Sequence, residues 1–134
     1  MKALLLLTAF SCLALPVRSQ TAGAPPNPQT LRQALVSFTW AWQPAKYKGD
    51  PIEVRYYKDG VATNPKAWVG TWEVTGLRTV TVSRTEKGKK EKSLLTFDPT
   101  FSTFDGVWWD GTSKVSGGRK APADPEATLT IKPK

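Results

Sequence analysis

The sequence predicts an all-β fold, in which an antiparallel meander forms a small barrel or sandwich of about eight strands with one short N-terminal helix. Hydrophobic and polar residues alternate in short runs after residue 37, which is typical of half-buried strands. Turn dipeptides such as Asp59-Gly60 and Asp110-Gly111 separate these runs. No helical runs alternate with them, so a parallel sheet is not expected. The length of 134 residues fits one such domain and leaves no room for a Rossmann pair or a TIM barrel.

Residues 1–19 have the pattern of a secretory signal peptide. Lys2 supplies a positive charge, an apolar run follows from Ala3 to Val17, and Ser19 precedes the expected cleavage site. We therefore expect export to the periplasm or the exterior, with no transmembrane segment in the mature protein. A spanning helix is an alternative, although the run is short for a bilayer. Lipidation at Cys12 is another; cleavage after Ser19 removes this cysteine, the only one in the chain.

The folded domain is expected to span residues 28–134, after a Pro/Ala/Gly-rich linker at 20–27. Asn27 is a suitable N-cap, and Pro28 suits the first position of a helix, where its missing N–H would be unpaired anyway. Leu31, Leu35 and Phe38 fall on one face at helical spacing. The pattern predicts a helix over about residues 28–36, which could close one end of a barrel.

The alternating runs predict strands within 38–42, 52–57, 61–63, 68–74, 79–83, 94–97, 104–109, 115–119 and 127–131. Asp98-Pro99 should end one of these strands. The lysine-rich segment 85–92 is interpreted as a solvated loop between two of them.

Short motifs follow the predicted helix in a recognisable order: Thr39-Trp40-Ala41-Trp42, Lys58-Asp59-Gly60, Gly70-Thr71-Trp72-Glu73-Val74, Val80-Thr81-Val82, Leu95-Thr96-Phe97-Asp98 and Val115-Ser116-Gly117. Over about residues 30–120 the chain resembles a type of small exported bacterial β-meander domain, and loosely the calycins, which are the lipocalin and avidin barrels. The resemblance implies a β-meander of the barrel type. Lipocalins and avidins carry Gly-x-Trp on their first strand, whereas Gly70-Thr71-Trp72 lies mid-chain here, so no binding residue is carried over.

Catalytic and metal chemistry is restricted by the absence of histidine. A Ser-His-Asp triad and a His-ligated metal site are excluded. Asp98, Asp105 and Asp110 could pair as carboxylates in a glycoside hydrolase, but each begins an ordinary turn dipeptide. Their spacing matches no EF-hand loop, so Ca²⁺ binding is not expected either. We predict no catalytic residue, no metal and no cofactor.

Six tryptophans are present, and four of them lie on apolar strand faces and should be core: Trp40, Trp42, Trp68 and Trp72. Neighbouring residues on a strand point to opposite faces, so the pairs Tyr56/Tyr57 and Trp108/Trp109 cannot share one core. Tyr56 and Trp108 continue apolar faces, which leaves Tyr57 and Trp109 as candidates for exposure. An exposed ring could stack on a sugar or meet a partner protein.

The chain has 19 Lys and Arg against 11 Asp and Glu, a formal net charge of +8. Four of the lysines lie close together in segment 85–92: Lys87, Lys89, Lys90 and Lys92. They could attract an acidic polysaccharide or another anionic envelope polymer. Nucleic acid is not an expected partner for an exported protein. The sequence thus favours an exported, non-enzymatic binding or accessory module with an aromatic and basic surface for polysaccharide, anionic polymer or protein; the alternatives are a ligand-carrying barrel and a carboxylate-based hydrolase.

Overall fold

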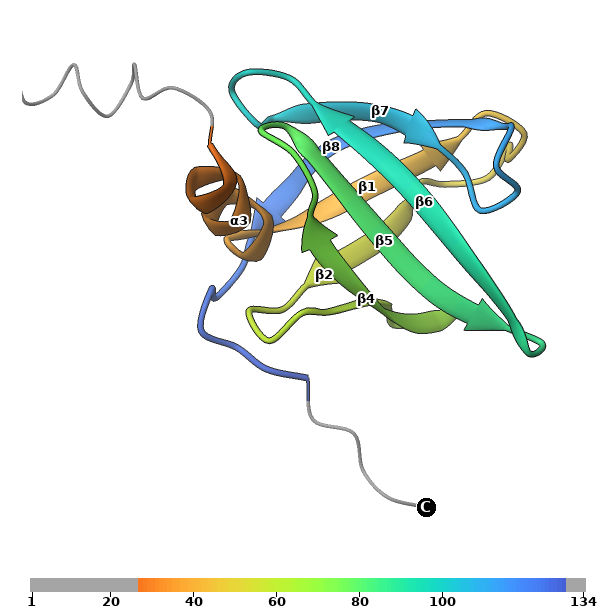
Figure 1. Ribbon diagram of the computed structural model, residues 1–134, viewed down its shortest axis with the longest axis horizontal. Coiled ribbons are helices and arrows are strands. Elements are labelled where there is room, and N and C mark those ends of the chain that lie inside the picture. The colour runs from red at the N-terminus through yellow and green to blue at the C-terminus, as the bar shows by residue number, and fades with distance from the viewer. Residues whose placement is uncertain (1–26, 130–134) are drawn as a thin grey trace, which may run out of the picture.

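The computed structural model describes residues 27–129, which form eight strands and one helix (Figure 1). The all-β prediction is therefore confirmed. The predicted signal peptide, Cys12 and all of the predicted linker except Asn27 lie outside the described residues.

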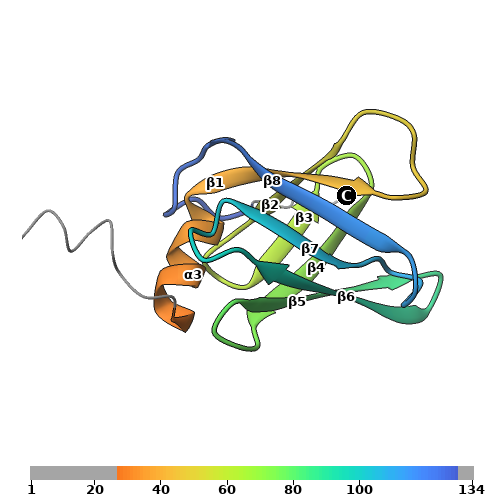
Figure 2. The same cartoon turned by 90° about the horizontal axis from the view of Figure 1, so that it is seen from above.

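The eight strands follow one another in chain order around a closed antiparallel barrel. They are β1 (Phe38–Pro44), β2 (Ile52–Tyr56), β3 (Val61–Asn64), β4 (Trp68–Val74), β5 (Thr79–Glu86), β6 (Lys89–Phe97), β7 (Thr103–Val107) and β8 (Lys114–Pro122). The last strand pairs with the first along its length, from Phe38 opposite Pro122 to Pro44 opposite Val115. Figure 2 shows β8 lying beside β1 at this closure. Of the two predicted architectures, the barrel is the correct one.

Helix α3 (Pro28–Val36) lies at one end of the barrel (Figure 1). The Asn27 side chain accepts hydrogen bonds from the backbone N–H of Gln29 at 2.9 Å and of Thr30 at 3.1 Å, as the sequence predicts for an N-cap. The inward face of the helix buries Leu31 and Leu35 completely. The helix contacts β1, β2 and β4 and thereby covers the apolar interior at this end.

The barrel interior is filled by aromatic side chains. Trp40, Trp42 and Tyr56 are fully buried, and Trp68 and Trp72 are nearly so, which confirms the predicted core tryptophans. Their rings pack edge-on or tilted, with centroids 5.3 Å apart for Trp40–Phe97, 5.7 Å for Tyr56–Trp72 and 6.0 Å for Trp42–Trp68. Burial raises the pKa of the Tyr56 hydroxyl above its ordinary value, so this group stays neutral.

Two predictions about strands are wrong. Segment 85–92 is not a loop: β5 and β6 run through it and meet at a two-residue turn, Lys87-Gly88, with Glu86 opposite Lys89. This hairpin extends beyond the body of the barrel (Figure 1), and residues 85–90 at its end are exposed, so both faces of this end can be polar. Of the strand predicted within 127–131, residues 127–129 form no strand, because β8 already pairs with β1 and leaves no free edge; residues 130–131 lie outside the described residues.

Candidate functional site

Trp109 is buried, which contradicts its predicted exposure. Only 5% of its surface is accessible, whereas Trp108, predicted to be core, is half-buried. Strand alternation does not apply to this pair because β7 ends at Val107 and the chain then turns, with the Gly111 N–H donating to the Trp108 carbonyl at 2.9 Å. Both indoles therefore reach Trp42, at centroid distances of 6.2 Å for Trp108 and 6.0 Å for Trp109.

Tyr57, the other aromatic candidate, is half-buried rather than freely exposed. The Arg55 guanidinium lies 5.0 Å from the centre of its ring and covers part of one face. Tyr56 is fully buried, so the predicted division of this pair between two faces holds. The two proposed aromatic contacts, Tyr57 and Trp109, do not form a shared exposed platform.

An ion pair lies next to Trp109 at one end of the barrel. The Nε and Nη2 atoms of Arg84 each lie 2.9 Å from Glu91 Oε1, and the two side chains are only 17% and 19% exposed. The Arg84 guanidinium also lies 4.5 Å from the centre of the Trp109 ring. These contacts turn the Glu91 carboxylate toward the barrel end and neutralise it there.

The predicted lysines divide between two places. Lys90 and Lys92 lie on the outer face of β6, opposite Thr85 and Ser83 of β5. They border a pocket of about 460 Å³, the lysine pocket, whose lining residues are Val69, Gly70, Thr71, Ser83, Arg84, Thr85, Lys90, Glu91 and Lys92. Lys87 lies in the turn of the hairpin, and Lys89 opens β6 on the face that alternates with Lys90. Within residues 27–129, none of the four lysines forms an ion pair.

The predicted turns at Asp98 and Asp110 are present, and their carboxylates are engaged by hydrogen bonds. Burial would raise the pKa of Asp98, but hydrogen bonds from the Thr100 hydroxyl and from the backbone N–H of Thr103 and Ser102 outweigh it and lower the pKa to about 2. The Asp110 carboxylate accepts from the Ser113 hydroxyl and from nearby backbone N–H groups, which likewise lower its pKa to about 2.

Asp105 differs from both other aspartates. Asp105-Gly106 was expected to be a turn, but it lies inside β7. Gly106 is needed here because a Cβ would come within 2.3 Å of the Leu94 carbonyl oxygen on β6. Alternation along β7 places Asp105 on the outer face of the barrel, where it is exposed, and its carboxylate accepts no hydrogen bond from any described residue.

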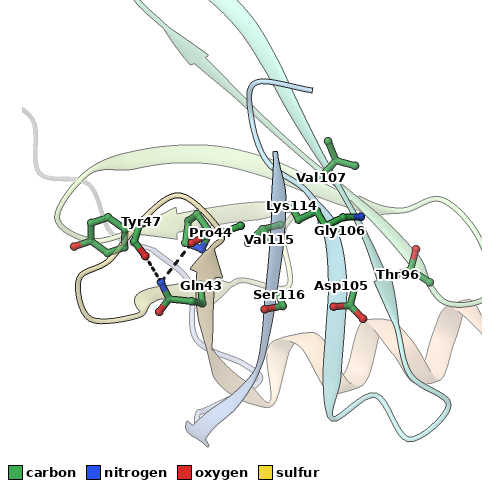
Figure 3. Close-up of a pocket in the computed structure, with 11 residues that line it drawn as sticks. Gln43, Pro44, Tyr47, Thr96, Asp105, Gly106, Val107, Lys114, Val115 and Ser116 are labelled. Atoms are coloured by element: carbon green, nitrogen blue, oxygen red, sulfur yellow. Dashed lines mark hydrogen bonds between the residues drawn. The ribbon is translucent and has the colours of Figure 1, made fainter. Parts of the chain in front are cut away.

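A second pocket, the polar groove, was missed by the sequence reasoning. Its volume is about 680 Å³, and Figure 3 shows the residues around it: Gln43, Pro44, Ala45, Tyr47, Thr96, Asp105, Gly106, Val107, Lys114, Val115 and Ser116. They come from β1 and the loop after it, β6, β7 and β8. The only sequence signal was alternation, which places Thr96, Asp105 and Ser116 on the outer face of their strands.

The composition of both pockets limits what chemistry they can perform. Within the part of the chain that the structure describes, no three metal-ligating side chains come together, and no helix is long and apolar enough to span a membrane. The lysine pocket offers cations and hydroxyls, with the Glu91 carboxylate paired to Arg84, and the polar groove offers the Asp105 carboxylate and the Lys114 ammonium group with hydroxyl and amide groups. No family model matches the chain, and the search of curated proteins finds no significant relative.

Proposed function

We propose that the protein is an exported, non-enzymatic binding module that attaches to an anionic polymer through the lysine pocket. The observation that carries the proposal is the placement of Lys90 and Lys92 on one outer face, beside the hydroxyls of Thr71, Ser83 and Thr85. Ammonium groups attract the anionic groups of the polymer, and hydroxyls can donate to their oxygens.

The inner face of the same hairpin strengthens this attraction. Glu91 lies between Lys90 and Lys92 in sequence and would cancel part of their charge if it faced the same way. Instead it pairs with Arg84 at the barrel end, at 2.9 Å. The outer face therefore keeps the two positive charges without an adjacent carboxylate from its own strand.

The other two function classes have less support. A ligand carrier needs an enclosed space, but aromatic rings occupy the barrel interior, and both the polar groove and the lysine pocket open on the outer face. A hydrolase needs two available carboxylates. Hydrogen bonds within their turns occupy the carboxylates of Asp98 and Asp110, so of the three candidate aspartates only Asp105 is available.

Export and ancestry are part of the proposal. The signal-peptide pattern of residues 1–19 supports export, and an exported protein can reach the anionic polymers of the cell envelope. The closed eight-stranded meander is compatible with the calycin-like exported domains that the sequence resembles.

The test is binding to polyphosphate and to polygalacturonate, as phosphate and carboxylate probes, over a range of salt concentrations. Wild-type affinity should fall as salt rises, because counterions compete for the lysines. The double variant Lys90→Gln/Lys92→Gln should bind more weakly, and the slope of log affinity against log salt should become shallower by about 2. Isothermal titration calorimetry measures both quantities.

A matched control removes the same charge elsewhere. Lys58 and Lys120 are paired with Glu126 and Glu53 at 2.6 and 2.8 Å, so Lys58→Gln/Lys120→Gln lowers the net charge equally and leaves the lysine pocket intact. This control should bind nearly as wild type. Equal weakening by both double variants would mean that net charge alone drives binding, and no binding of either polymer at low salt would refute the proposal.

A further inference from the structure

Four polar side chains form a continuous row across four strands of the polar groove. Thr96 of β6 is opposite Asp105 of β7, Asp105 is opposite Ser116 of β8, and Ser116 is opposite Gln43 of β1. Three strand spacings give the row a length of about 14 Å. The barrel thus places four hydrogen-bonding groups in line, although they are far apart in the sequence.

The row has hydrogen-bonding capacity that the protein does not use. Thr96, Asp105 and Ser116 are exposed, and no described residue forms a hydrogen bond with their side chains. Gln43 donates its amide N–H to the Tyr47 carbonyl at 2.7 Å and to the Pro44 carbonyl at 3.4 Å (Figure 3), which leaves its own side-chain oxygen as an acceptor.

Apolar groups border the row on two sides. Val107, next to Asp105 along the outer face of β7, is opposite Leu94, of which 47% is exposed. At the other end lies the ring of Tyr47, which is 48% exposed and is positioned by the hydrogen bond from Gln43 to its carbonyl. Its hydroxyl end lies over Gly49, where a Cβ would come within 2.5 Å of the Tyr47 oxygen. The groove therefore combines polar groups in line with apolar surfaces beside them.

We infer that the polar groove binds an uncharged oligosaccharide. A sugar ring carries hydroxyls at its edge, which match the row, and C–H groups on its faces, which match Tyr47, Val107 and Leu94. The central Asp105 carboxylate accepts strongly from hydroxyls. Lys114 of β8 also lines the groove, so the two charges offset each other and the groove favours an uncharged ligand over an acidic one. The length of the row suits a short stretch of such a chain.

This inference does not depend on the proposed function. The polar groove shares no lining residue with the lysine pocket, and the two sites differ in charge. The groove has one carboxylate, Asp105, and one ammonium group, Lys114, whereas the pocket presents Lys90 and Lys92. A polysaccharide with both neutral and acidic segments could engage both. Either site could equally exist without the other.

The experiment titrates the full protein with neutral tetrasaccharides of glucose, mannose and N-acetylglucosamine, and with tetragalacturonate as the charged counterpart. Amide shifts in ¹H–¹⁵N spectra locate the ligand, and the side-chain amide of Gln43 is a direct reporter within the row. At least one neutral sugar should shift Gln43, Asp105 and Ser116. Tryptophan fluorescence is unsuitable because five of the six indoles are buried.

Three substitutions test the groove. Asp105→Ala should weaken binding of the neutral sugar about tenfold, because it removes a charged acceptor. Tyr47→Ala should weaken it several-fold by removing the ring. Gly49→Ala should have a smaller effect in the same direction, because the added methyl displaces the end of the Tyr47 side chain and leaves the barrel unchanged. Denaturant unfolding checks that each variant remains folded.

The control variant Lys90→Gln/Lys92→Gln should bind the neutral sugar as tightly as the wild type does, even if it no longer binds anionic polymers. The inference is overturned if no neutral tetrasaccharide shifts the row at millimolar concentration, if Asp105→Ala and Tyr47→Ala both bind as wild type, or if tetragalacturonate binds the row as tightly as the neutral sugars.

Discussion

The Trp109 indole is enclosed by Trp42, Trp68 and the Arg84 guanidinium, with its ring centre 5.2 Å from that of Trp68. Its position follows from the turn after β7, which directs two successive tryptophans toward the same end of the barrel. A sequence pattern cannot show this, because alternation predicts opposite faces only while a strand continues. At this position, the residue at which the strand ends decides which side chain is core.

Exchanging the two tryptophans for alanine should reveal this arrangement. Trp109→Ala should lower the free energy of unfolding by about 3–5 kcal/mol, because it empties a buried aromatic site and removes the ring beneath Arg84. Trp108→Ala should cost less than about 2 kcal/mol, because that indole is only half-buried. Urea unfolding measures both. A larger loss for Trp108→Ala than for Trp109→Ala would contradict the packing.

The β5–β6 hairpin turns through two residues with positive φ, Lys87 at 52° and Gly88 at 79°. Such a turn favours Asn-Gly, because a lysine side chain is strained in the left-handed region. Lys87→Asn should therefore stabilise the protein by about 0.5–1 kcal/mol. Gly88→Ala should destabilise it by about 1–2 kcal/mol through backbone strain alone, since a Cβ there would contact nothing within 4 Å.

Thermal unfolding of the two variants tests this prediction. Lys87→Asn also removes one of the four lysines without touching the lysine pocket, so polymer binding should change little. Destabilisation by Lys87→Asn would show that this lysine makes a contact more important than the strain of its backbone.

Individual elements differ in how well the sequence predicts them. Helix α3 and its N-cap were predicted correctly because the signals for them, Asn27, Pro28 and Leu31, depend only on residues near them in the sequence. The strands through segment 85–92 were missed because a hairpin that extends into solvent needs no apolar face. Residues 127–131 alternate like a strand, but alternation says nothing about whether a partner strand is available for pairing.

The candidate sites show the same limit. Lys90 and Lys92 could be proposed from composition, since neighbouring lysines remain close however the chain folds. The row of Gln43, Thr96, Asp105 and Ser116 could not, because it depends on the register of four strands and on the closure between β1 and β8. Register depends on pairing between distant segments, which the pattern of one strand does not contain.

The whole molecule should lose stability in acid over a defined range. The folded state lowers the pKa of Asp98 and Asp110 to about 2 from an ordinary value of 3.8, so their hydrogen bonds stabilise it fully above about pH 4.5. This contribution should disappear as the pH falls from about 4 to about 2. Between about pH 5 and pH 8 stability should be nearly constant, because the chain has no histidine.

The midpoint of urea unfolding, measured from pH 2 to pH 8, follows this dependence. Asp98→Asn and Asp110→Asn should each lower the midpoint at neutral pH and reduce its change in acid. Asp105→Asn is the matched control, because this carboxylate accepts no hydrogen bond from the described residues. A steep change around pH 6 would contradict the assignment.

The pairing of β8 with β1 also constrains when the protein can fold. The strand made last must reach the strand made first, so a nascent chain that stops before residue 114 has two open edges and an uncovered aromatic interior. Such a chain is a substrate for chaperones and a risk for aggregation. The barrel consequently closes only after β8 has emerged, so strands β1 to β7 cannot complete the fold during the earlier part of synthesis.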